Sequence, residues 1–177
     1  MGPRTMQSDV PPADGVQEWF AGRLPDDWFE APPEVVVDRE EVTVIGTLRA
    51  SAGAEGGESG AQWEAGRISR FRESTREERM RIAREAERRF GRKVAWGAQA
   101  GATREVFANL AVPVMTRLRQ PERRVLDTLV DSGVARSRSE ALAWCVRLVG
   151  THTEDWLAEL RTAMESVERV RRTGPAA

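Results

Sequence analysis

The chain has 177 residues, of which 40% are hydrophobic and 31% are charged, and its formal net charge is -1 at pH 7. This length suits one modest domain or two small ones, and the near-neutral charge gives no overall signal for nucleic-acid binding. A single cysteine and a single histidine, Cys145 and His152, exclude an intramolecular disulfide, a cysteine cluster for zinc and a histidine-based metal site. We therefore expect no metal and no cofactor.

Charge is distributed unevenly along the chain. Residues 1–66 carry 4 arginines and 13 acidic residues, whereas residues 67–93 carry 11 basic and 5 acidic residues. Residues 113–150 carry 7 arginines and 4 acidic residues. An acidic first half followed by a basic second half is a pattern that can signal contact with nucleic acid.

The sequence gives no sign of a membrane or secretory segment. It lacks the apolar core of a signal peptide near its start. No apolar run approaches the length of about 18 residues that a membrane helix needs. We expect a cytoplasmic protein that does not contact the membrane.

Residues 1–33 are predicted to be a tail followed by an aromatic-rich segment. Residues 1–15 contain several prolines and glycines, which is typical of a loosely held chain end. Residues 16–31 place four aromatic side chains in a short polar stretch, namely Trp19, Phe20, Trp28 and Phe29. These rings need a surface to pack against, so the segment either covers a domain core or docks onto a protein partner.

Residues 34–111 are predicted to form a small α+β domain of order ββ-loop-βαβ. Two β-branched runs in residues 34–48 flank a polar turn, which predicts a hairpin. Residues 50–61 are small and Gly-rich, as in a flexible loop, and residues 68–72 alternate as a third strand would.

A helix is the next predicted element of this domain. Residues 74–77 have the capping-box pattern STRE, and the helix that follows buries one side before Gly91 ends it. Residues 93–96 are predicted to be a further strand. The arginines of residues 67–93 form either a second nucleic-acid surface or a solvated helix face with Glu–Arg pairs four residues apart.

Residues 112–150 carry the strongest functional signal, and they begin with a short strand. Residues 114–119 alternate between two sets of side chains, which is the period-two pattern of a strand with one buried face. The two sets are Val114, Thr116, Leu118 and Met115, Arg117, Arg119. An isolated strand leaves its backbone groups unpaired, so we expect a second copy of the chain to pair with it.

Two helices are predicted after this strand. Residues 121–132 carry an apolar stripe at helical spacing, and Gly133 is a natural stop. Residues 137–140 have a capping-box pattern ahead of a second helix that is apolar around most of its circumference. Such a helix needs cover on several sides, and a second subunit would supply it.

This strand and helix pair resembles the ribbon-helix-helix (Arc/MetJ-type) DNA-binding domain. The resemblance covers the strand, both helices and the glycine turn, and its most specific part is the sequence SGVARSRSEAL at residues 132–142. In that family two chains pair their strands into an antiparallel ribbon that lies in the DNA major groove. The family also holds a DNA phosphate at the N-terminus of the second helix.

The resemblance implies a role for each part of residues 112–150. The side chains expected to contact DNA bases are Met115, Arg117 and Arg119. The residues expected to contact DNA phosphates are Arg136, Ser137, Arg138 and Ser139. The residues expected in the dimer core are Val114, Thr116, Leu118, Leu126, Leu129, Leu142, Cys145 and Leu148. Physical chemistry agrees, because arginine is the commonest bidentate reader of guanine and a helix N-terminus attracts anions.

Residues 151–177 are predicted to form a terminal amphipathic helix and a tail. Its apolar face consists of Trp156, Leu157, Leu160, Met164, Val167 and Val170. The fold class is thus expected to be α+β, with the small ββ-loop-βαβ domain first, then a ribbon-helix-helix (strand-helix-helix) module, then this helix.

These features predict a homodimeric, sequence-specific DNA-binding transcriptional regulator whose partners are double-stranded DNA and a second copy of the chain. Two alternatives are open. In the first alternative, the protein is an antitoxin that binds a toxin through residues 16–31. In the second, it is an assembly module that uses the ribbon-helix-helix fold only to dimerise. The sequence offers no nucleophile–base pair and no metal set, so we expect no catalytic residue and no enzymatic activity.

Overall fold

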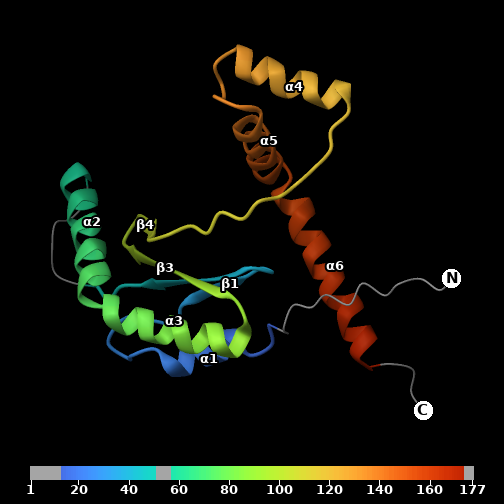
Figure 1. Cartoon of the computed structure of the whole chain (residues 1–177). Coiled ribbons are helices and arrows are strands. Elements are labelled where there is room, and N and C mark those ends of the chain that lie inside the picture. The colour runs from blue at the N-terminus through green and yellow to red at the C-terminus, as the bar shows by residue number, and fades with distance from the viewer. Residues whose placement is uncertain (1–12, 51–56, 174–177) are drawn as a thin grey trace. The chain divides into compact units, whose positions relative to one another are not determined.

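The protein has an α+β fold, as the sequence predicts. The computed structural model describes residues 13–50 and 57–173, and Figure 1 shows its ribbon. The chain divides into two compact units, Met1–Val112 and Pro113–Ala177. The predicted tail at residues 1–12 and the last residues, 174–177, lie outside the described part of the chain.

The first unit contains a four-stranded sheet in the order β1-β2-β3-β4. Its elements are α1 Val16–Arg23, β1 Glu34–Val37, β2 Glu41–Thr47, α2 Gly57–Ser74, α3 Arg76–Phe90, β3 Lys93–Ala100 and β4 Thr103–Val106. The two central strands, β2 and β3, run parallel, while each edge strand is antiparallel to its neighbour. Helices α2 and α3 together form the crossover that a parallel pair requires.

The predicted hairpin at residues 34–48 is confirmed as β1 and β2. The side chain of Asp38 closes its turn, because Oδ1 accepts hydrogen bonds from the amides of Glu40 at 2.8 Å and Glu41 at 2.7 Å. An aspartate that bonds the backbone two or three residues ahead is a common turn former.

The strand predicted at residues 68–72 is wrong, because these residues belong to α2. Ile68 is fully buried and Phe71, three residues later, is half-buried, whereas Ser69 and Arg70 are exposed. A spacing of three places both apolar side chains on one face of a helix. In a strand, the same spacing would place the two side chains on opposite faces, so these residues fit a helix better than a strand.

The neighbouring predictions are right in part. Helix α3 follows and ends at Gly91, whose φ of 65° is the left-handed conformation that favours glycine. The capping box at residues 74–77 does not form, since the hydroxyls of Ser74 and Thr75 both donate to the Phe71 carbonyl oxygen instead. Residues 93–96 begin β3, as predicted.

Two further corrections change the predicted order of elements. In the Gly-rich stretch 50–61, residues 57–61 are helical, and residues 51–56 lie outside the described part of the chain. Strand β4, with its glycine turn at Gly101 (φ 58°), was not predicted. The observed order is therefore αββααββ rather than ββ-loop-βαβ.

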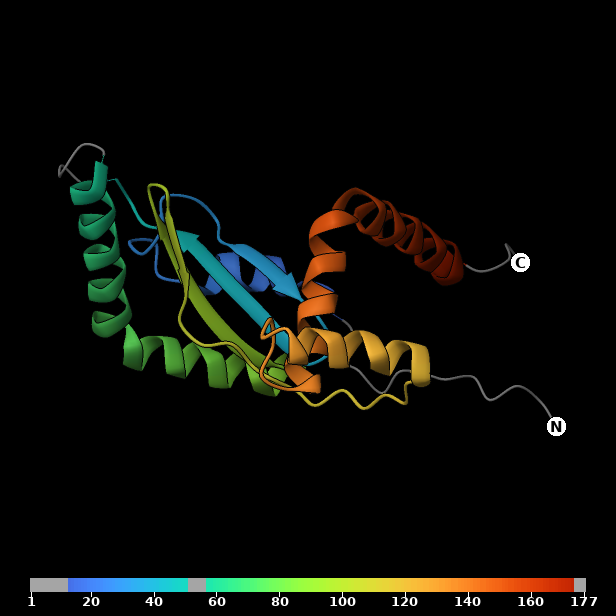
Figure 2. The ribbon, with the colours of Figure 1, turned by 90° about the horizontal axis from the view of Figure 1, so that it is seen from above.

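Aromatic side chains fill the core on one face of the sheet. Helices α1 and α3 lie along that face (Figures 1 and 2). Phe20 is fully buried, and its ring meets the Trp96 ring edge-to-face at 5.9 Å. Phe29 is also buried, so the aromatic segment of residues 16–31 covers the core of its own unit.

A glycine in β2 makes room for one of these rings. Gly46 lies beneath Phe29, and a Cβ atom at Gly46 would overlap three atoms of the ring. The side chain of Phe29 is part of the buried cluster, so it has little freedom to move aside.

The second unit contains three helices: α4 Gln120–Asp131, α5 Arg138–His152 and α6 Glu154–Thr173. All three were predicted. The strand predicted within residues 114–119 is absent from the single chain, where these residues are extended but form no regular element. No helix in residues 13–50 and 57–173 is long and apolar enough to cross a membrane.

We expect Gly46→Ala to lower the free energy of unfolding by about 1–3 kcal/mol, because the added methyl group overpacks the core against Phe29. Chemical denaturation followed by tryptophan fluorescence measures this. Gly66→Ala is the matched control. Gly66 lies within α2 with open space around its Cβ position, so alanine there should raise stability by roughly 0.5–1 kcal/mol. Equal effects of the two substitutions would contradict the close contact at Gly46.

Candidate nucleic-acid interface

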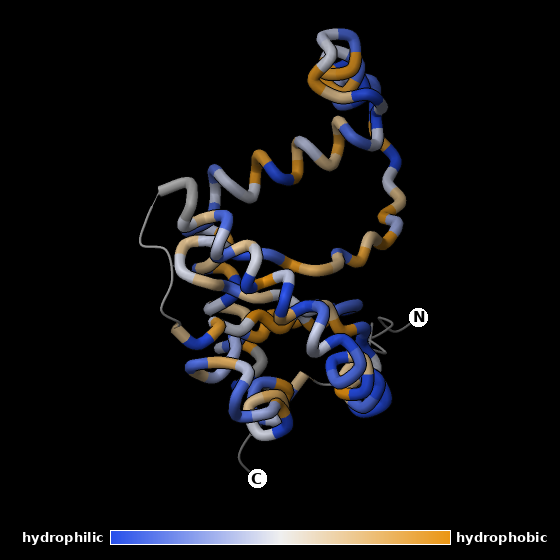
Figure 3. The backbone as a smooth tube through the Cα atoms, turned by 90° about the vertical axis from the view of Figure 1, so that its left-hand side faces the viewer, coloured by the Kyte–Doolittle hydropathy of each residue, from blue (hydrophilic) through white to orange (hydrophobic). Residues whose placement is uncertain are grey.

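The segment before α4 is extended and open to solvent. Val114 is 84% exposed and Met115 is 97% exposed. Within the described residues, the backbone of residues 114–118 makes no hydrogen bond to other backbone groups. Figure 3 shows that this part of the chain carries both hydrophobic and hydrophilic residues. The segment thus has the alternation of a strand but no strand to pair with.

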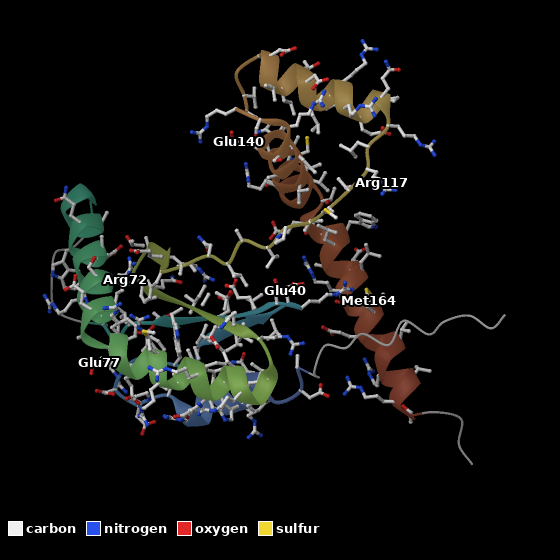
Figure 4. All side chains as sticks on the ribbon, viewed as in Figure 1. Glu40, Arg72, Glu77, Arg117, Glu140 and Met164 are labelled. Carbon is white, nitrogen blue, oxygen red and sulfur yellow. The ribbon has the colours of Figure 1, made fainter. Side chains whose placement is uncertain are left out.

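The three residues predicted to contact DNA bases are all exposed: Met115, Arg117 and Arg119. Figure 4 shows Arg117 projecting from the extended segment. Arg119 is the N-cap residue of α4, where its side chain makes no capping hydrogen bond. The guanidinium of Arg123 donates to the Leu118 carbonyl oxygen at 2.8 Å, which fixes the end of the segment to the first turn of α4.

The capping box predicted at the start of α5 is present. The hydroxyl of Ser137 accepts a hydrogen bond from the Glu140 amide at 3.2 Å. In return, the Glu140 carboxylate accepts one from the Arg136 amide at 2.8 Å (Figure 4). The remaining amides of the first turn, at Arg138 and Ser139, have no partner within the helix, as at any helix N-terminus.

The Arg138 side chain has a partner that the sequence did not indicate. Its guanidinium donates two hydrogen bonds to the Asp127 carboxylate, at 2.6 and 2.9 Å, and so ties the start of α5 to α4. The hydrogen bond to Arg138 lowers the pKa of Asp127 below its usual value, and the same bond raises the pKa of Arg138. A phosphate contact by this side chain requires exchange of the carboxylate for the phosphate. The other predicted phosphate-contacting residues, Arg136, Ser137 and Ser139, are exposed.

The turn between α4 and α5 depends on Gly133. Its φ is 78°, which only glycine adopts readily, and the next two amides donate to the Leu129 carbonyl oxygen. This geometry brings Ala135 into contact with α4 and sets the angle at which Ser137 opens α5.

The residues predicted for the dimer core fall into two groups. Leu126 is buried beside Ala135 and Ala141, and four predicted residues pack against this cluster: Leu118, Leu129, Leu142 and Cys145. The remaining three are exposed: Val114, Thr116 and Leu148. The single chain therefore assembles part of the predicted core and leaves the rest open.

Helices α5 and α6 expose further apolar side chains in the single chain. On α5 these are Val146, Leu148 and Val149. On α6 they are Trp156, Leu160, Met164, Val167 and Val170. Figure 4 shows Met164 projecting from α6. Helix α6 contributes no residue to the buried cluster among the described residues of the second unit.

Part of the arginine run of residues 67–93 is used in contacts within the first unit. Arg81 pairs with Glu78 and Glu85, and Lys93 pairs with Glu87 at 3.0 Å. These pairs favour a solvated helix face over a second nucleic-acid surface. Among the described residues, no three histidine, cysteine or acidic side chains are grouped closely enough to hold a metal ion.

Both units have relatives. Residues 14–106 match the family described as Rv1265-like protein, N-terminal domain, and residues 119–171 match the Mb1296 C-terminal domain. The uncharacterized proteins Mb1296 of Mycobacterium bovis and Rv1265 of Mycobacterium tuberculosis are each 62% identical to the chain over 169 residues. The alignment covers 96% of this chain and 74% of each relative. The chain belongs to the Rv1265-like family.

No solved structure matches the chain. Neither matched family description names a ribbon-helix-helix domain, so that resemblance stays a prediction for this member of the Rv1265-like family. The extended segment at residues 112–118 lies between the two matched stretches of sequence, directly before the helical unit.

In Arg138→Gln, we expect the pKa of Asp127 to rise towards its ordinary value of about 3.9, because the charged hydrogen bond that favours the carboxylate is lost. Carboxyl-carbon NMR across an acid titration measures this. The lowered pKa in the native protein stabilises the fold above the unfolded-state pKa of the carboxyl. That stabilisation is lost as the pH falls through the folded-state pKa. Arg136→Gln is the control, since Arg136 pairs with Glu140 and its loss should leave Asp127 unchanged. An ordinary pKa for Asp127 in the unsubstituted protein would contradict the pairing.

Proposed function

We propose that the protein is a homodimeric regulator that binds specific sequences of double-stranded DNA through a ribbon-helix-helix arrangement of residues 112–150. The observation that carries this proposal is the extended stretch at residues 114–118, where Val114, Thr116 and Leu118 alternate with the longer side chains of Met115 and Arg117 and where the backbone lacks backbone partners among the described residues. A two-stranded ribbon fits the DNA major groove. Such a regulator would act in the cytoplasm, where its DNA lies.

Unpaired backbone groups favour a second copy of the chain as the partner. An exposed extended stretch with free amide and carbonyl groups is a template for strand pairing. Two identical copies pair antiparallel around a two-fold axis, so each side chain on one face meets its counterparts from the other chain. Val114, Thr116 and Leu118 then share the inner face, and Met115 and Arg117 point outward.

Apolar side chains of the helical unit support the same partner. Its own core holds Leu126, Ala135 and Ala141 as buried residues, which is little for a unit of this length. Val146 and Val149 on α5 are 65% and 52% exposed. The same helix of a second copy could cover these side chains. Each Å² of apolar surface buried in this way would stabilise the dimer by about 25 cal/mol.

The start of α5 supports a phosphate contact. The cap formed by Ser137 leaves the first two amides of the helix available, and the positive end of the helix dipole lies there. Arg136 adds positive charge one residue before the cap, with its side chain 93% exposed. In this proposal the amides of Arg138 and Ser139 hold one phosphate, which sets the position of the ribbon in the groove.

We expect the purified protein to select a defined sequence from random double-stranded DNA, and Arg117→Ala to relax that selection at one base pair per half-site. Loss of one bidentate arginine should reduce discrimination there by about 1–3 kcal/mol. Sequencing of the bound fragments measures the change.

Arg136→Gln is the matched control for this selection, because it also removes one exposed arginine. It should weaken binding to all sequences alike and reduce the slope of binding against salt by about one. If wild type and Arg117→Ala select the same sequence equally well, residues 114–119 do not read the bases.

Adjacent lysine substitutions test the ribbon itself. We expect Val114→Lys to shift the monomer–dimer equilibrium by roughly tenfold or more towards the monomer, because it would bury an unpaired charge in the ribbon's inner face. Met115→Lys should leave the dimer intact, since Met115 faces outward. Both positions are exposed in the single chain, so neither change should unfold it. Sedimentation over a range of concentrations measures the equilibrium.

Three outcomes of sedimentation and of DNA binding at several salt concentrations would decide against the proposal in different ways. A wild-type monomer at all concentrations would remove the second copy on which the ribbon depends. Equal effects of Val114→Lys and Met115→Lys would show that the two faces are not distinct. A stable dimer that binds DNA weakly and with little salt dependence would favour the assembly module instead.

A further inference from the structure

The first unit contains a cavity that combines aromatic and basic side chains. Its volume is about 350 Å³, and it lies between α2 and the end of β2. The apolar lining comes from Trp28, Leu48 and Phe71, and the basic lining comes from Arg49, Arg67 and Arg70. The lining belongs entirely to described residues of the first unit, so the cavity is separate from the proposed DNA-binding segment.

The aromatic part of the cavity is held in place by the core. The Trp28 and Phe71 rings meet edge-to-face, with centroids 5.4 Å apart and planes at 89°. Both side chains are half-buried. Leu48, which directly follows β2, is buried. Rings fixed in this way offer apolar surface to a ligand without first losing much side-chain freedom.

None of the three arginines forms an ion pair with a carboxylate among the described residues, although Glu64 interacts electrostatically with Arg67. Arg49 donates to the Asp26 carbonyl oxygen at 2.5 Å, and Arg67 donates to the Arg49 carbonyl oxygen. The guanidinium of Arg67 also lies 4.9 Å from the centre of the Trp63 ring. Neither contact cancels a positive charge, and Arg70 forms no ion pair within the part of the chain described.

Elsewhere in the same unit, several basic side chains do have acidic partners. Arg23 pairs with Glu85 at 2.7 Å, and Arg104 pairs with Glu34 at 2.9 Å. At the cavity, Asp27 is the acidic residue in the lining, so three cations face one carboxylate. The excess of positive charge favours an anionic ligand.

We propose that this cavity binds a small compound that carries a phosphate or carboxylate group on a flat ring. Guanidinium groups match both anions in charge and in planar hydrogen-bonding geometry. The ring would lie against Trp28 and Phe71, and the anionic group would lie between the guanidinium groups of Arg67 and Arg70. The volume falls in the range of small-molecule pockets. This inference does not rest on the proposed DNA-binding function, because it concerns the first unit alone.

Single-stranded nucleic acid is recognised by the same kinds of side chain, with bases stacked on aromatic rings beside a basic groove. The limited volume favours a small molecule over a strand that extends beyond the cavity in both directions. A short oligothymidylate therefore belongs among the probes, as a competitor to the proposal.

The test is an NMR titration of the full chain with phenyl phosphate, which reads the Trp28 indole and arginine side-chain signals. Benzoate distinguishes a carboxylate from a phosphate. Inorganic phosphate lacks the ring, and benzyl alcohol lacks the charge. We expect phenyl phosphate or benzoate to shift the signals of Trp28 and Arg70 in a saturable way. Inorganic phosphate and benzyl alcohol should each bind at least about tenfold more weakly.

Arg70→Gln should weaken binding of the preferred anion by about tenfold, because it removes a charged hydrogen bond. Arg70 is exposed, so the variant should fold. Arg84→Gln is the matched control. It removes the same charge from an exposed position on α3 outside the cavity and should leave binding unchanged.

Two results would overturn the proposal. One is an equal loss of binding in Arg70→Gln and Arg84→Gln, which would indicate a diffuse charge effect. The other is tighter binding of oligothymidylate than of any ring compound at the same residues, with affinity that grows with strand length. That result would identify the cavity as part of a nucleic-acid groove.

Discussion

Backbone groups without a partner are the constraint on which the helical unit depends. The stretch before α4 has free amide and carbonyl groups and keeps Val114 in solvent, while the helices after it close only a small core. Water can hydrate the exposed backbone groups in an isolated chain, whereas the exposed apolar side chains are unfavourable there. In the proposed dimer, one partner of the same sequence would pair the backbone groups and cover the apolar side chains. The proposed dimer rests on these unpaired backbone groups and exposed apolar side chains. The proposed DNA-facing side chains and the cover over α5 depend in turn on that dimer.

The first unit, in contrast, closes its core with side chains of the same chain. The aromatic side chains of residues 19–29 help to close the core of the sheet, and Gly46 lets the Phe29 ring approach β2. The use of these aromatic residues in the core bears on the antitoxin alternative. Phe20 and Phe29 are buried in the core, so they are not free to dock onto a toxin without opening their own unit. A partner role for residues 16–31 stays a prediction without structural support.

Local patterns predicted the parts of the fold that local interactions determine. The hairpin closed by Asp38, the helix ended by Gly91 and the cap at Ser137 depend on residues a few positions apart. Residues 68–72 were wrongly predicted, because their burial depends on Trp28 and Phe107, which are distant in sequence. The Asp127–Arg138 pair and the cavity beside α2 were missed for the same reason: each joins side chains whose proximity arises only from folding.

The exposed stretch before α4 has one more consequence, which concerns the lifetime of the protein. Residues 108–117 are all solvent-exposed, and Arg117 and Arg119 lie in an extended backbone that fits the cleft of a trypsin-like protease. In the proposed dimer, strand pairing would cover this site, whereas a free subunit would leave it open to cleavage. Resistance to a trypsin-like protease would therefore report on assembly.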